Sequence, residues 1–279
     1  MKKSNIELFI ERVKVEANIH KIIKKDLIYQ LIDCFKKDYT KMNYPQNINN
    51  PLETVLEFYK NYNLEYYEII VEGIKNNKIL IDKNNTKSFM DTKNGKLYIK
   101  LFRNDLDVFM LAHEFAHYID RSFNPPIIPN KYNFLCEVYS FYIEKKLEDW
   151  LDNEKNYELI NVKRNNRMYY ESKMLSAIES MMFYEELYIK NGKISIEDLE
   201  INTVKKVMNY NYDLEIGLVN YLLRYPLANI LSDYLINNNM IEKDTDIYKV
   251  CLNTNLYQVI PKSSIKKRIN NITDWIFIE

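Results

Sequence analysis

Two of the three histidines of this chain stand in the pentapeptide HEFAH at positions 113–117. On a helix, residues four apart project from the same face, so the imidazoles of His113 and His117 can bind a single zinc ion. Glu114 lies about 100° round the helix, where its carboxylate can take a proton from water that the metal activates. The spacing therefore predicts a zinc site with Glu114 as general base.

The residues around this motif favour a buried helix over an exposed one that carries His and Glu by chance. Apolar residues 109–112 (FMLA) precede the motif, and Phe115 and Ala116 lie within it. Buried polar side chains need partners, and a metal ion supplies them. We therefore interpret the histidines as ligands.

A catalytic zinc ion needs a third protein ligand and one open position. Phe123 stands where a HExxHxxGxxH site would have its third histidine, so the ligand must be a carboxylate or a thiolate. Glu137 is our preferred candidate, because it lies among apolar residues in the next expected helix, after a proline-containing loop that can fold back. Cys136 could compete, although we interpret it as a structural cysteine. Glu144 and Glu148 are interpreted mainly as solvated residues.

The elements that must position these residues are mostly helices. Asn94-Gly95 is a type I′ hairpin signal between strands 87–91 and 96–102, which form the only β element expected. The fold class is therefore mainly α with a small antiparallel sheet beside the HExxH helix. Helices are expected in the first 40 residues, from Pro51 to Tyr59, from Tyr66 to Ile74, and over 105–122, 131–150, 165–190, 196–209 and 213–237.

Composition excludes several classes of function. Lysine plus arginine and aspartate plus glutamate each number 39, so no global field favours nucleic acid or an anionic membrane. The four glycines are scattered, which excludes glycine-rich nucleotide-binding loops. Three distant cysteines exclude a disulfide framework. No segment reads as a transmembrane helix or signal peptide, so we expect a cytoplasmic protein without nucleic-acid or membrane partners.

Two stretches resemble the thimet oligopeptidase/oligoendopeptidase F family of gluzincin zinc metallopeptidases. LYIKLFRNDLDVFMLAHEFAH (97–117) is similar to the strand and capped helix that lead into HExxH in that family. FLCEVYSFYIE (134–144) is similar to the following helix, which carries E-x-x-S. The resemblance implies a zincin-type catalytic domain in which Glu137 is the third zinc ligand, with Ser140 in the serine position. The wider likeness covers about residues 51–235.

The chain departs from the family pattern in several places. Ala116 replaces a common glycine, and Asp120 stands where members have a histidine. Asp120 could still accept a hydrogen bond from a ligand imidazole. The chain is also much shorter than typical members, because it lacks most of their N-terminal helical half. It would be a short, reduced member of the family.

The family also has a tyrosine-rich helix that supplies donors to the substrate carbonyl and the developing oxyanion. NYLLRYPLANIL (220–231) is similar to this helix. The resemblance implies that Tyr221 stabilises the oxyanion, with Tyr225 as the next choice. The family's histidine near this helix is missing, and Tyr210 or Tyr212 could replace it.

The function implied is that of a zinc-dependent metalloendopeptidase, a hydrolase with one Zn²⁺ per chain that cleaves a peptide or protein substrate. The strand at 87–91 would bind the peptide as an added β-strand. A dedicated protease of toxin or regulatory type, acting on one partner protein, is an alternative. An inactive binding module stabilised by zinc is another. The expected organisation is an N-terminal helical segment (1–50), the catalytic domain (51–240) and a C-terminal segment (241–279) packing on it.

Overall fold

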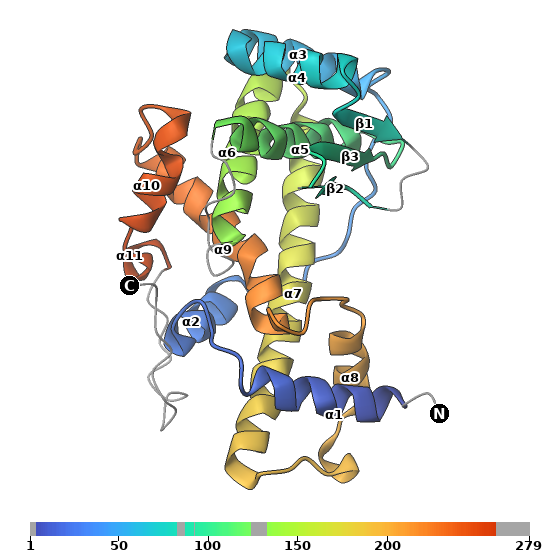
Figure 1. Cartoon of the computed structure of the whole chain (residues 1–279), viewed down its shortest axis with the longest axis vertical. Coiled ribbons are helices and arrows are strands. Elements are labelled where there is room, and N and C mark those ends of the chain that lie inside the picture. The colour runs from blue at the N-terminus through green and yellow to red at the C-terminus, as the bar shows by residue number, and fades with distance from the viewer. Residues whose placement is uncertain (1–3, 83–86, 92, 124–132, 261–279) are drawn as a thin grey trace. The chain divides into compact units, whose positions relative to one another are not determined.

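A computed structural model of this chain describes residues 4–82, 87–91, 93–123 and 133–260 (Figure 1). These residues form a mainly helical protein with a small mixed sheet of three strands. Among them no helix has the length and apolar character needed to cross a bilayer.

The chain divides into two compact units, each assembled from segments that are far apart in the sequence. The first unit takes in Met1–Tyr39, Met168–Ile230 and Thr254–Glu279, and the second takes in Thr40–Arg167 and Leu231–Asn253. Two long helices, α7 (Tyr157–Asn191) and α9 (Leu218–Asn237), contribute residues to both units.

The second unit contains the HExxH helix and the sheet. Most of its expected helices are confirmed, including the one that begins at Pro51 behind the capping side chain of Asn50. The proline-containing loop expected after the HExxH helix, with Pro125 and Pro126, lies outside the described residues. The elements that lie wholly in this unit are α3 (Pro51–Tyr62), α4 (Leu64–Lys75), β1 (Ile79–Asp82), β2 (Phe89–Asp91), β3 (Lys96–Lys100), α5 (Leu106–Phe123), α6 (Asn133–Asn153), the 3-10 turn η3 (Asp244–Asp246) and α10 (Ile247–Leu252).

The first unit contains both N-terminal helices, as the sequence predicts. The long helix α7 ends at Asn191, and Gly192 follows it with a φ of +70°, which suits the position after a helix C-terminus. The helix begins at Tyr157, earlier than expected. The elements that lie wholly in this unit are α1 (Asn5–Glu16), α2 (Lys25–Phe35), the 3-10 turn η2 (Ile196–Asp198), α8 (Ile201–Met208) and α11 (Leu256–Val259).

The sheet has the strand order β1-β3-β2. β2 and β3 pair antiparallel as expected, but β1 pairs parallel to β3, so the expectation of a purely antiparallel sheet with one hairpin is wrong. The four residues ILID of β1 are too short for periodicity to reveal them as a strand. Alternation along β3 buries Leu97 and Ile99, and β3 contacts α5.

The hairpin turn also differs from expectation. Asp91 pairs with Lys96, so residues 92–95 separate the two strands, as the expected strand bounds imply, whereas a type I′ turn has a loop of two residues. A type I′ turn needs a positive φ at both central residues, whereas of Asn94 and Gly95 only the glycine has one, at +60°. The carboxylate of Asp91 accepts the N–H groups of Lys93 and Asn94, which favours a wider turn built on the aspartate side chain.

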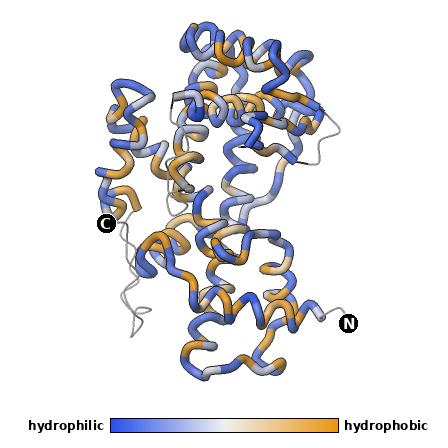
Figure 2. The backbone as a smooth tube through the Cα atoms, in the orientation of Figure 1, coloured by the Kyte–Doolittle hydropathy of each residue, from blue (hydrophilic) through white to orange (hydrophobic). Residues whose placement is uncertain are grey.

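Helix α5 lies in the apolar interior of the second unit and contacts α3, α4, β3 and α6. Hydrophobic positions, orange in Figure 2, recur along it, as the apolar flanks of the motif predict. The buried hydroxyl of Tyr59 donates to the carbonyl of Ala112 at 2.8 Å, which joins α3 to the middle of α5. The buried apolar residues of α5 are Val108, Phe109, Leu111, Ala112, Phe115, Ala116 and Ile119.

A buried ion cluster holds the start of α9 in the first unit. The carboxylate of Glu16 accepts the N–H groups of Leu218 and Val219 at 2.7 and 3.2 Å, where the helix dipole favours a negative charge. Gly217 precedes them with a φ of +80°, and a Cβ there would lie 2.7 Å from a Glu16 oxygen. Lys21 pairs with Glu16 at 2.8 Å. The positive φ and the close Glu16 carboxylate together explain why position 217 requires glycine.

Glu185 makes the stability of the first unit dependent on pH. Lys21 lies 3.3 Å from this buried carboxylate. Burial raises the pKa of Glu185 to about 7, against the lowering effect of Lys21 and with a further increase from Glu16. Because the folded pKa exceeds the ordinary value of 4.5, the favourable contribution is complete below pH 4.5 and is lost as pH rises through 7.

We expect Glu185→Gln to remove most of this loss, which amounts to at most about 3 kcal/mol. Urea unfolding at pH 5 and at pH 8 measures the difference in unfolding free energy for each protein. The wild-type protein should lose stability between these two values, and the variant should lose much less. Equal losses in both would show that Glu185 does not titrate in this range.

Candidate metal centre

Helix α5 presents the three motif residues on its one partly exposed face. His113, Glu114 and His117 are each partly exposed, whereas Phe115 and Ala116 between them are buried. An α-helix turns by about 100° per residue, so residues 113, 114 and 117 share one face and residues 115 and 116 lie on the other. The expected helix and the expected face are thus both present, and the two imidazoles lie one turn apart with ring centroids 4.8 Å apart.

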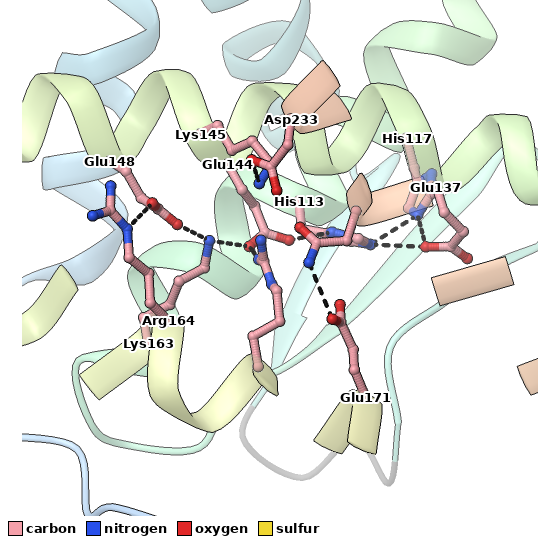
Figure 3. Close-up of polar contacts among 12 residues, drawn as sticks. His113, His117, Glu137, Glu144, Lys145, Glu148, Lys163, Arg164, Glu171 and Asp233 are labelled. Atoms are coloured by element: carbon pink, nitrogen blue, oxygen red, sulfur yellow. Dashed lines mark hydrogen bonds and ion pairs between the residues drawn. The ribbon is translucent and has the colours of Figure 1, made fainter. Parts of the chain in front are cut away.

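Helix α6 brings Glu137 to the same place. Its Oε2 lies 3.3 Å from Nε2 of His113 and 3.7 Å from Nε2 of His117, and the two Nε2 atoms are 3.2 Å apart (Figure 3). Each residue offers one ligand atom to this group, and Glu137 is buried. The structure therefore brings together the three residues that the sequence nominates as ligands.

The spacing of these atoms suits a zinc ion. Bonds of 2.0–2.1 Å to a tetrahedral zinc place neighbouring ligand atoms about 3.3–3.4 Å apart. The three observed separations are 3.2, 3.3 and 3.7 Å. Two imidazoles and one carboxylate also form a ligand set that zinc accepts, and three protein ligands leave a position open for water or substrate. The residues present therefore fit the metal.

Residues of α6 orient both imidazoles through the ring nitrogens that face away from this group. Oε1 of Glu144 lies 2.7 Å from Nδ1 of His113, so that nitrogen donates and leaves Nε2 with a lone pair. The hydroxyl of Ser140 lies 3.1 Å from Nδ1 of His117 and can donate to the carbonyl of Cys136 at 3.4 Å. Ser140 then accepts from His117, and both Nε2 atoms are available to a metal.

These contacts correct the interpretation of Glu144 and Glu148 as mainly solvated. Glu144 is buried and makes ion pairs with Lys163, at 2.9 Å, and Arg167. Glu148 is buried as well and pairs with Lys163 and Arg164. Both cations of Glu144 come from α7, far along the chain. Glu144 lies at Nδ1 of His113, and not beside the Nε2 atoms that face the proposed metal.

Asp120 and Cys136 have surroundings that do not favour a role in the metal centre. Asp120 is a hydrogen-bond partner of Tyr248, and the two ligand imidazoles have Glu144 and Ser140 at their Nδ1 atoms. Burial raises the pKa of Cys136 to about 11, so at neutral pH its sulfur is a thiol and not the thiolate that zinc binds.

Glu144 and the role of Ser140 were missed from the sequence, although a signal exists. Glu137, Ser140 and Glu144 are spaced by three and four residues, which places them on one face of α6. A polar stripe of this kind on a buried helix indicates a set of ligands with their supporting groups.

Glu114 lies beside the triad formed by His113, His117 and Glu137 and is connected to the sheet. The side chain of Ser88, directly before β2, hydrogen-bonds to the Glu114 carboxylate. The same hydroxyl accepts the N–H of Lys100 in β3 at 3.0 Å. Burial raises the pKa of Glu114 above its ordinary value, while His117 and His113 act to lower it. Such a carboxylate is a stronger base than one in water.

The electrostatics of the triad favour a cation. Burial alone would lower the pKa of His113, but the carboxylates of Glu137 and Glu144 beside its two nitrogens raise it to about 10. Burial raises the pKa of Glu137, yet the two imidazoles hold it below its usual range. The negative charge that favours a proton on His113 also favours a metal cation at the same nitrogen.

The tyrosines proposed for the oxyanion belong to another part of the structure. Tyr221 and Tyr225 lie in α9 within the first unit, whereas the triad belongs to the second. The guanidinium of Arg224 lies over both tyrosine rings, 4.5 and 4.6 Å from their centroids. Tyr212 is a tilted neighbour of Tyr221. The role of these tyrosines in catalysis stays a prediction.

We expect Ser140→Ala to weaken zinc binding about 10–100-fold, the usual cost of removing the outer partner of a ligand histidine. Without the hydroxyl, Nδ1 of His117 loses the group that fixes its tautomer and ring orientation. Competition with a chromophoric chelator measures the zinc affinity. Ser180→Ala is the matched control, because the hydroxyl of this serine donates within its own helix, to the carbonyl of Ser176. Equal affinities in wild type and Ser140→Ala would contradict the assignment.

Comparison with models of protein families, with curated proteins and with solved structures finds no match to this chain. The resemblance to the oligoendopeptidase F family therefore remains a prediction from the residues at 97–117 and 134–144. The geometry of the triad stands independently of that resemblance.

Proposed function

We propose that this protein is a zinc-dependent peptidase with a zincin-type catalytic domain. The observation that carries the proposal is the arrangement of three ligand atoms of His113, His117 and Glu137, 3.2–3.7 Å apart, with the carboxylate of Glu114 next to them. Spacing of this kind suits a zinc ion, and a partly exposed glutamate beside it suits proton transfer.

A zinc ion held by the triad would polarise the scissile carbonyl and lower the pKa of its water to about 7. Residues of the chain supply proton transfer and the orientation of the ligands. Glu114 accepts a proton from the attacking water and delivers it to the leaving amine. Ser88 holds the Glu114 carboxylate in place. The contacts of Glu144 and Ser140 keep both ligand imidazoles in the orientation that presents Nε2.

The sheet supports a peptide as substrate. β2 is an edge strand, so a peptide in extended conformation can pair with it through main-chain hydrogen bonds. Because Ser88 directly precedes β2 and bonds to Glu114, this edge begins next to the proposed base. Recognition through the main chain tolerates many side chains. We therefore infer that the substrate is a peptide or a protein segment in extended conformation.

The proposal is tested with purified protein, mixed quenched-fluorescent peptides and a set of folded proteins. Zinc-loaded protein should cleave peptides, a chelator should stop cleavage, and added zinc should restore it. Cleavage of one folded protein without general peptide cleavage would favour the dedicated protease. Zinc binding without any cleavage would favour the binding module and contradict the proposal.

A further inference from the structure

A chain of charged side chains leads from the proposed metal ligands into α7 (Figure 3). One carboxylate oxygen of Glu144, Oε1, faces Nδ1 of His113 at 2.7 Å. The other, Oε2, is in contact with Arg167 and lies 2.9 Å from Nζ of Lys163. The two oxygens of Glu144 thus have different partners: Oε1 contacts the imidazole of His113, and Oε2 contacts the cations of α7.

Arg167 contacts two of the side chains that touch the His113 ring. Its guanidinium pairs with Glu144 and also lies over the ring of Phe141, 4.5 Å from the centroid. The ring of Phe141 in turn meets His113 edge to face, with centroids 5.4 Å apart at 78°. The Arg167 side chain is 13% exposed, so little water competes for these contacts.

Lys163 does not duplicate this arrangement. Its ammonium group is shared between Glu144 and Glu148, and it lies over the ring of Phe109. An ammonium is also a point charge, whereas a planar guanidinium can pair with a carboxylate and stack on an aromatic ring at once. Arg167 alone among the described cations on α7 reaches Glu144 and the face of Phe141.

Arg167 can affect the orientation of the ligand His113 through Glu144, which contacts both residues. Without Arg167, Oε2 of Glu144 would keep the ammonium of Lys163, which Glu148 shares, so the carboxylate could rotate and withdraw its acceptor from the imidazole. We propose that Arg167 is a positioning residue for the metal centre, holding Glu144 so that His113 presents Nε2 to the metal. This inference rests on the proposed metal centre but not on catalysis.

Zinc affinity measured by chelator competition tests the inference. We expect Arg167→Met, which replaces the aliphatic stem of the arginine but lacks the guanidinium, to bind zinc about 10–100-fold more weakly than wild type. Arg164→Met is the matched control: Arg164 lies on the same helix, pairs with Glu148 and has a side chain that is 58% exposed. The control should bind zinc like wild type. Wild-type affinity in Arg167→Met, or an equal loss in both variants, would overturn the inference.

A double-mutant cycle shows whether Arg167 acts through Glu144. If it does, Arg167→Met should weaken zinc binding much less in a Glu144→Gln background than in wild type. Additive losses would contradict the inference. The visible absorption of Co²⁺ bound in place of zinc gives a second measurement, because it reports the geometry of the ligands. It should change in Arg167→Met and stay unchanged in Arg164→Met.

Arg167→Lys keeps the inference falsifiable if the methionine variant does not fold. Lysine restores a cation to Glu144 without the stacking on Phe141, so its zinc affinity should lie between those of wild type and Glu144→Gln. A folded Arg167→Lys protein that loses as much affinity as Glu144→Gln would overturn the inference. A wild-type chain that binds no zinc would instead overturn the proposed function, and zinc binding without peptide cleavage would leave the role of Arg167 intact.

Discussion

Replacing Glu114 by glutamine is expected to leave zinc binding unchanged and to lower peptide turnover roughly 10²–10⁴-fold, the range for loss of a general acid–base group. Glutamine keeps the size of the side chain and can still bond to Ser88, but it cannot accept a proton from water. The loss should appear in kcat more than in KM, because proton transfer belongs to the transition state. Steady-state kinetics on the zinc-loaded variant measure both.

The control for this experiment is Glu72→Gln, a change of the same kind in α4, where Glu72 is exposed. It should cleave peptides at the wild-type rate. A fully loaded Glu114→Gln protein that also keeps the wild-type rate would contradict the role of Glu114. A peptidase without this base would need another acceptor for the proton.

Removing any one member of the triad is expected to cost more zinc affinity than removing an outer partner. His113→Ala, His117→Ala and Glu137→Ala each delete one of three ligands, so affinity should fall by more than the roughly 10–100-fold expected for Ser140→Ala. Metal analysis after dialysis should find about one zinc per wild-type chain and little in the variants. Activity should fall in parallel.

His20→Ala is the control for the histidine variants, because among the described residues His20 is not part of the group of candidate metal ligands. The variant should retain its zinc. The Glu137 variant is the decisive one among the ligands. Full zinc occupancy in Glu137→Ala would show that the third ligand is another residue, and would contradict the triad that the structure brings together.

Local geometry explains what the sequence determined by itself. The HEFAH spacing predicts two imidazoles on one face of a helix because a helix has 3.6 residues per turn, whatever the rest of the chain does. The apolar flanks likewise predict a buried helix, and Val108, Phe115 and Ile119 are each fully buried. Periodicity predicts most helices for the same reason.

Contacts between elements explain what the sequence could not show. Glu144 and Glu148 look like solvated residues on a charged helix, and they are buried because α7 supplies Lys163, Arg164 and Arg167. Nothing in the spacing of α6 reveals which distant helix packs against it. The parallel pairing of β1 with β3 and the wider hairpin turn are likewise products of long-range pairing and of one aspartate side chain.

The metal centre combines both kinds of information. The sequence by itself determined the two histidines and the glutamate between them, because one helix turn sets their spacing. The apolar neighbours of Glu137 also nominated it as the third ligand, but only the tertiary structure showed what Glu144 does: the packing of α5 on α6 places Glu137 at both Nε2 atoms and Glu144 at Nδ1 of His113. Glu137 and Glu144 lie seven residues apart on one face of α6, and the position of the neighbouring helix gives them different nitrogens of the same histidine.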